Sequence, residues 1–133
     1  MDDIHVHIRV DFNERCSIGP GKISLLQSIQ ATRSLSESAR TLGMSYRRAW
    51  LLVHNVNESF DEPAVDFNVG GKDGGGAQIT AFGERLIAVY RDFEAKIEKL
   101  SANTFVGLRP KSKGRGSNTP SKRTLRKRIA TPL

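Results

Sequence analysis

The chain has 133 residues, with 21 Lys plus Arg, 14 Asp plus Glu and a formal net charge of +7. This length suits one domain and excludes a two-domain enzyme with an interdomain cleft. The longest apolar run, residues 49–53, is far shorter than the ~20 residues that a membrane span needs. The single cysteine, Cys16, excludes an internal disulfide, and the acidic start of the chain is unlike a signal peptide. We therefore expect a cytoplasmic protein.

The positive charge is concentrated at the C-terminal end. Residues 103–133 contain nine Lys and Arg and no acid, whereas residues 1–102 sum to −2. Few large apolar side chains interrupt this tail, so we predict that it is disordered from about Thr104 onward. A basic tail attracts polyanions: DNA first, RNA second and an anionic membrane surface third. A solubilising end without any partner is the alternative.

An alternating pattern opens the chain and predicts a strand over residues 4–12 with one buried face. Its apolar members are Ile4, Val6, Ile8, Val10 and Phe12. His5 and His7 lie on the polar face. We interpret them as solvated rather than as metal ligands, because no cysteine is close and His54 is the only other histidine. Residues 13–17 predict a turn.

Three helices are expected next. Pro20 suits the first position of a helix that runs to about Thr32. Ser34 and Glu37 form a capping signal for a short helix that ends at Gly43, and Gly43 suits a left-handed turn residue. Ser45 then caps a second helix, whose apolar stripe is Ala49, Val53, Val56 and Phe60. Two short amphipathic helices joined by Gly-Met-Ser predict a helix-turn-helix, and small Ala39 and Ala49 permit close packing.

A glycine-rich hairpin follows this motif. Residues 65–69 and 77–79 predict two strands, and residues 70–76 form a loop that carries Lys72. A hairpin in this position is typical of a wing, whose glycines allow close approach to a sugar-phosphate chain. A nucleotide-phosphate loop does not fit, because Lys72 is followed by Asp73 and Asp66 stands where the first glycine is needed.

The last helix is expected from Ala81, capped by Thr80, to about Ala102. Its apolar stripe is Phe82, Leu86, Val89, Phe93, Ile97 and Leu100. A helix of ~22 residues is ~33 Å long and extends beyond so small a domain. We therefore favour helix-to-helix dimerisation over a stripe that only covers the domain's own core.

The polar face of the second motif helix is the candidate DNA-binding surface. Arg47 and Arg48 suit guanine edges or phosphates, and Leu51 suits a thymine methyl. Ser45 and Tyr46 suit phosphates near a helix N-terminus. The full set of candidate contacts is Ser45, Tyr46, Arg47, Arg48, Leu51, His54 and Lys72. We expect Trp50 to be structural, packed against the preceding helix, and a solvated role for each arginine is the alternative.

Three segments together carry a family resemblance: LGMSYRRAW at 42–50, GGKDGGGA at 70–77 and T-x-F-G-x-x-L-I at 80–87. Over roughly residues 18–95 the chain resembles the N-terminal DNA-binding domain of ModE-type molybdate-responsive transcription regulators. The winged helix of LysR-type regulators is a more distant relative. The resemblance implies a winged helix-turn-helix that dimerises through its terminal helices and binds promoter DNA. It also implies that residues 45–48 start the recognition helix and that Lys72 lies in the wing.

Two features depart from the family pattern. Asp73 stands where the family often has glycine, beside the expected phosphate contact. Full-length regulators of this family carry a C-terminal pair of small β-barrel modules that bind molybdate, and this chain has a basic tail in that place. We therefore carry over no oxyanion-binding residues and expect no cofactor or metal.

The expected fold is mainly α with a small β wing: a winged helix-turn-helix over residues 1–102, followed by a basic tail over 103–133. The expected function is a dimeric, bacterial, nucleoid-associated regulator that binds double-stranded DNA and no membrane. A low-specificity architectural DNA-binding protein and a protein-interaction module built on Trp50 and Leu51 are the alternatives. An enzyme is not expected, because no nucleophile–base set or metal-ligand cluster is present.

Overall fold

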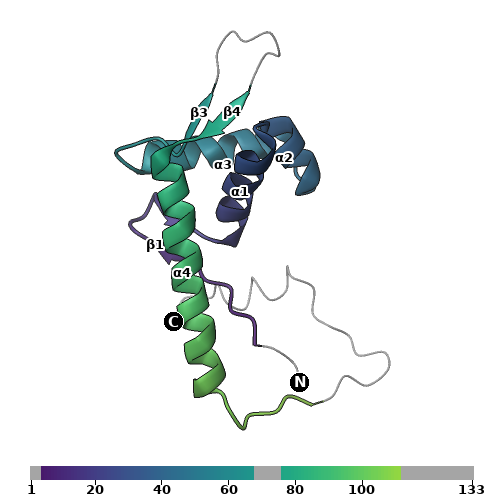
Figure 1. Ribbon diagram of the computed structural model, residues 1–133, viewed down its shortest axis with the longest axis vertical. Coiled ribbons are helices and arrows are strands. Elements are labelled where there is room, and N and C mark those ends of the chain that lie inside the picture. Colours follow the sequence, from purple (N-terminus) through teal and green to yellow (C-terminus); the bar gives the residue numbers. More distant parts are fainter. Residues whose placement is uncertain (1–3, 68–75, 112–133) are drawn as a thin grey trace.

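The computed structural model describes residues 4–67 and 76–111 (Figure 1). The predicted class, mainly helical with a small β wing, is confirmed: these residues form four helices and two small sheets. In chain order the elements are β1 (Val10–Asp11), β2 (Ser17–Ile18), α1 (Pro20–Thr32), α2 (Leu35–Thr41), α3 (Tyr46–Ser59), β3 (Val65–Phe67), β4 (Ala77–Ile79) and α4 (Ala81–Thr104).

The helix-turn-helix forms as its capping residues predict. The Ser34 hydroxyl accepts a hydrogen bond from the Glu37 amide at the start of α2, and Gly43 turns the chain with a φ of 66°. Only a residue without a Cβ adopts that angle at little cost, so Gly43 allows the sharp turn. Ala39 and Ala49 are fully buried between α2 and α3, as the sequence predicted.

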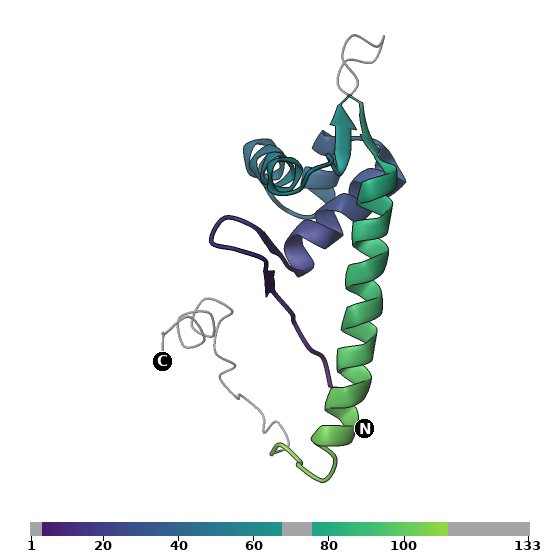
Figure 2. The ribbon, with the colours of Figure 1, turned by 90° about the vertical axis from the view of Figure 1, so that its left-hand side faces the viewer.

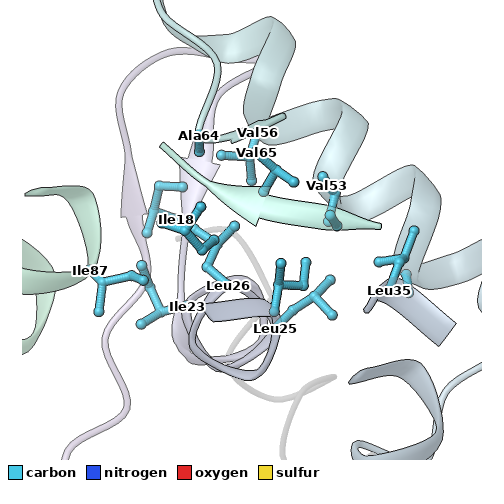
Figure 3. Packing of buried hydrophobic residues seen from close by; sticks show 14 of the residues in the cluster. Ile18, Ile23, Leu25, Leu26, Leu35, Val53, Val56, Ala64, Val65 and Ile87 are labelled. Atoms are coloured by element: carbon cyan, nitrogen blue, oxygen red, sulfur yellow. The ribbon is translucent and has the colours of Figure 1, made fainter. Parts of the chain in front are cut away.

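Helix α1 lies at the centre of the core and contacts α2, α3, α4 and β4. It buries side chains on more than one side, because Leu25 and Leu26 are adjacent in sequence and both inaccessible. Figure 3 shows Leu25 directed toward the side of Leu35 and Val53, whereas Ile23 lies near Ile87 of α4. Burying such side chains contributes roughly 1.5–3 kcal/mol each, so this core holds the motif helices in a fixed relation to α4.

The base of the predicted wing is an antiparallel pair of strands. Val65 pairs with Ile79 and Phe67 with Ala77, and in both views this pair lies at the end of the molecule opposite the C-terminal end of α4 (Figures 1 and 2). The Ala77 amide donates to the Arg33 carbonyl over 3.1 Å, which fixes the wing to the junction between α1 and α2. The rest of the predicted wing, including Val69 and Lys72, lies outside the described residues.

Helix α4 starts at a close junction and then extends beyond the other helices (Figure 2). The Thr80 hydroxyl caps the Gly83 amide and donates to the Pro63 carbonyl over 2.7 Å. The helix continues to Thr104, two residues beyond the predicted end, so Thr104 is helical rather than disordered. Most of the predicted tail, residues 112–133, lies outside the described part of the chain. No helix in the described ranges has the length and apolarity of a membrane span.

The N-terminal strand is much shorter than predicted. Only Val10 and Asp11 form β structure, paired with Ile18 and Ser17 in a small hairpin. The segment from Ile4 to Arg9 is extended without strand pairing. The alternating exposure persists, with Val6 and Ile8 half-buried, because this segment lies along α4, where the Tyr90 hydroxyl donates to the Ile8 carbonyl over 2.6 Å. The covered face is shorter than predicted, because Ile4 and Phe12 are 39% and 57% exposed, and the segment forms no long ladder of strand hydrogen bonds.

Candidate nucleic-acid interface

Helix α3 presents one polar face to solvent. Its inner stripe, Ala49, Val53 and Val56, is fully buried, and Phe60 is half-buried at the C-cap. With that stripe fixed, the opposite face must point outward, because residues on one helix are related by ~100° per step. The predicted site residues in the described ranges are all exposed: Ser45, Tyr46, Arg47, Arg48, Leu51 and His54. Arg47, Leu51 and His54 lie on this outward face, whereas Arg48 flanks it, Tyr46 lies near the inner edge and Ser45 is the N-cap.

The first turn of α3 combines cationic side chains with a helix N-terminus. The Ser45 hydroxyl accepts from the Arg48 amide over 3.1 Å, and the first turn contains no acidic residue. Within the described ranges, neither Arg47 nor Arg48 forms an ion pair. The positive end of the helix dipole and two arginines therefore reinforce each other, which is the arrangement that attracts phosphates.

The middle of α3 carries an aromatic stack on its exposed side. Trp50 is 41% exposed and lies parallel to the His54 ring, with 4.7 Å between centroids. The Trp50 ring therefore stacks on a residue of its own helix and stays partly exposed, and its expected packing against the preceding helix stays a prediction.

Two asparagines that follow on α3 have structural roles. Asn55 accepts from the Lys22 ammonium over 2.7 Å, and burial lowers the pKa of Lys22. Asn57 accepts from the amides of Ala64 and Val65 and donates to the Val65 carbonyl. The Asn57 side chain thus substitutes for a strand partner and fixes the start of β3 against α3. The sequence reasoning missed this contact, since an asparagine in a helix gives no sign of a distant backbone partner.

A second candidate surface is apolar and lies between the N-terminal hairpin and α4. A cavity of about 230 Å³ is lined by Val10, Phe12, Ile18, Leu86, Val89, Tyr90 and Phe93. Val89 is 61% exposed and Phe93 is 41% exposed. Helix α4 buries Gly83, Ile87 and Tyr90 on its domain side, so the predicted stripe faces partly outward rather than into the core.

Two predicted features of the site remain to be placed. Lys72 and Asp73 of the predicted wing lie outside the described residues. His5 and His7 are exposed. Within residues 4–67 and 76–111, no group of three or more His, Cys, Asp or Glu is arranged to hold a metal ion.

The order of the helices, the turn at Gly43 and the β3–β4 pair directly before a long helix define a winged helix-turn-helix. An exposed, basic first turn on the second motif helix is the arrangement expected of a recognition helix in this class.

Relatives of the chain agree with this class, although no family model matches it. The transcriptional regulator ModE of Yersinia pestis is 38% identical over 97 residues, which are 73% of this chain and 36% of that protein. The DNA-binding transcriptional dual regulator ModE of Escherichia coli strain K12 is 40% identical over 80 residues, 60% of this chain and 30% of the relative. The molybdenum-pterin-binding protein MopB of Rhodobacter capsulatus is 43% identical over 83 residues, 62% and 31% of the two chains.

These matches confirm the resemblance: the chain is homologous to ModE transcriptional regulators. It spans about a third of the length of the curated relatives it matches. The ModE relatives are transcriptional regulators and not enzymes, which agrees with the prediction that this chain is no enzyme.

Proposed function

We propose that this protein is a transcriptional regulator that binds duplex promoter DNA as a homodimer in the bacterial cytoplasm. In this proposal the N-terminal half of α3 enters the major groove, and Arg47 and Arg48 contact bases or phosphates. Ser45 and Tyr46 contact the backbone beside the helix N-terminus. The wing, with Lys72, follows the sugar-phosphate chain, and the basic tail adds affinity that is independent of sequence.

One observation carries the proposal. The first turn of α3 is exposed, acid-free and basic, and it belongs to a chain homologous to ModE regulators. A helix that only packed against its own domain would gain nothing from two outward arginines at its positive end, because each cation opposes the helix dipole there. A polyanion that approaches this end compensates both charges.

The homodimer is supported by the outward apolar stripe of α4. Val89, Phe93 and Leu100 leave large apolar surfaces in water along one side of this helix. The apolar cavity beside them can receive side chains from a second copy. Two copies joined in this way would present two α3 helices to two half-sites of one duplex.

Selection of bound sequences from random DNA, with and without molybdate, tests the proposal. We expect a selected duplex that binds more tightly than random DNA, and we expect Arg47→Ala to relax the base preference. Lys99→Ala, on the C-terminal part of α4, removes one exposed charge and serves as the control. Equal affinity for selected and random DNA would favour a low-specificity architectural protein. Binding to neither duplex at low salt, together with a stable complex with another protein, would favour an interaction module.

A further inference from the structure

Three exposed side chains form a continuous row along α3, each one turn after the last. Trp50 stacks on His54 with an interplanar angle of 9°, and His54 Nε2 lies 3.3 Å from Glu58 Oε1. The side chains of His54 and Glu58 are 51% and 69% exposed. The row therefore lies at the surface, on the outward face of the candidate recognition helix.

The imidazole of His54 has a neighbour on two sides. The Trp50 ring stacks on one face of the His54 ring, and the Glu58 carboxylate lies beside its Nε2 atom. An exposed histidine without such contacts exchanges between rotamers, and ordering its side chain on a ligand costs conformational entropy. Here much of that ordering is already present in the free protein.

Glu58 also favours a hydrogen on one particular ring atom. A carboxylate oxygen accepts hydrogen bonds, and Glu58 Oε1 lies 3.3 Å from His54 Nε2, so the tautomer with its hydrogen on Nε2 suits this contact better than the one with a lone pair there. Purine N7, guanine O6 and thymine O4 in the major groove are acceptors as well. The same ring edge can therefore exchange Glu58 for any of these atoms without rotating, whereas cytosine presents only an amino donor there.

Resting on the proposed DNA-binding role of α3, we propose that Trp50 is a positioning residue that holds His54 for contact with an acceptor atom on a base edge. His54 is then a specificity-determining residue, and Glu58 is the internal competitor that a correct base displaces. The Glu58 carboxylate also repels phosphates, so DNA without the matching base gains little from this part of the helix.

The proposal separates affinity from specificity. Trp50→Ala frees the His54 ring, so we expect the ratio of selected to random affinity to fall about tenfold, with little change on random DNA. Trp50→Phe retains an aromatic surface under the imidazole and should restore most of the ratio. His54→Ala should lose preference at the same base pair as Trp50→Ala, and Arg47→Ala at a different one.

The decisive experiment measures dissociation constants of the full chain and of these four variants for a selected duplex and a random duplex of equal length. Proton NMR of the free proteins measures the His54 ring signals in parallel. We expect an upfield ring-current shift that is lost in Trp50→Ala and largely kept in Trp50→Phe.

One result overturns the positioning role alone: an affinity ratio that Trp50→Ala leaves unchanged. This holds whether both affinities stay the same or both fall equally, and an equal fall indicates a structural defect. A His54 signal that is the same with and without Trp50 contradicts the stack itself. If the unmodified chain binds neither duplex, the proposed function fails and this inference fails with it. If the chain prefers the selected duplex but Trp50→Ala keeps that preference, only this inference fails.

Discussion

Position 83 needs a glycine because neighbouring atoms leave no room for a side chain, and not because of its backbone angles. A Cβ at this position would lie 2.3 Å from the Ala64 carbonyl oxygen and 2.9 Å from Ile79 Cγ2. Helix α4 can therefore meet the β3–β4 junction closely only because residue 83 has no side chain. The neighbouring bond from the Thr80 amide to the same Ala64 carbonyl, at 3.0 Å, holds the contact in place.

Gly83→Ala should lower the free energy of unfolding by about 2–4 kcal/mol, because a backbone carbonyl must move to admit the methyl group. Gly21→Ala is the matched control, since nothing lies within 4 Å of a Cβ at that position in α1. We expect this control to be neutral or to stabilise by up to about 1 kcal/mol. Urea unfolding of both variants checks the pair, and equal midpoints would contradict the packing described.

The sequence predicted some residue roles and not others, for a physical reason. Ser34, Gly43, Ser45 and Thr80 act on backbone groups within a few positions of themselves, so local pattern predicts them. Tyr90 bonds Ile8 across 82 positions and Arg91 bonds Gln27 across 64. Contacts between residues so far apart in the sequence depend on the assembled fold. The spacing of neighbouring residues therefore does not predict them.

At the scale of an element, the N-terminus of α3 combines a stabilising cap with a proposed phosphate contact. Ser45→Ala should cost about 1 kcal/mol, because the Arg48 amide loses its acceptor. Ser45→Asp keeps a capping oxygen and should retain the thermal midpoint, while its negative charge weakens DNA binding at least about tenfold. Calorimetry and DNA titration together check this difference. If Ser45→Asp retains both the thermal midpoint and the DNA affinity, the residue acts only as a cap.

The N-terminal segment, residues 4–12, forms much less strand than its sequence pattern predicts. Period-two alternation predicted one covered face over residues 4–12, but the covered part is limited to Val6, Ile8 and Val10, and only Val10 and Asp11 have strand partners. A strand needs a neighbour along its length, and β2 supplies only two residues. The remainder of the segment lies along α4, where the Tyr90 hydroxyl donates to its backbone. An alternating pattern shows that one face is covered, but it does not show whether a strand or a helix covers that face.

At the scale of the whole molecule, the apolar side of α4 is the proposed dimer contact. Phe93→Glu places a charge in the proposed dimer contact and should convert the dimer to a monomer, with a large loss of affinity for a two-half-site duplex. Ala88→Glu adds the same charge at an exposed position on the other side of α4 and should leave the dimer intact. Light scattering coupled to size exclusion checks both variants. A monomeric unmodified chain, or an unchanged mass for Phe93→Glu, would contradict the assembly.

In the proposed function the tail contributes affinity and no sequence preference. Removing residues 112–133 deletes seven Lys and Arg and no acid. We expect the slope of log affinity against log salt to decrease in magnitude by up to about 6, because each released phosphate contact contributes about 0.9. The base-preference profile should stay the same. A slope unchanged by the truncation would show that the tail does not contact DNA.

The most direct measurement of the central claim is amide chemical-shift mapping of the full chain with a selected duplex. If α3 enters the groove, the largest changes fall on residues 45–54, and the C-terminal half of α4 changes little. If the changes instead concentrate on α4 or the N-terminal segment while the amides of Arg47 and Arg48 stay in place, α3 is not the recognition helix.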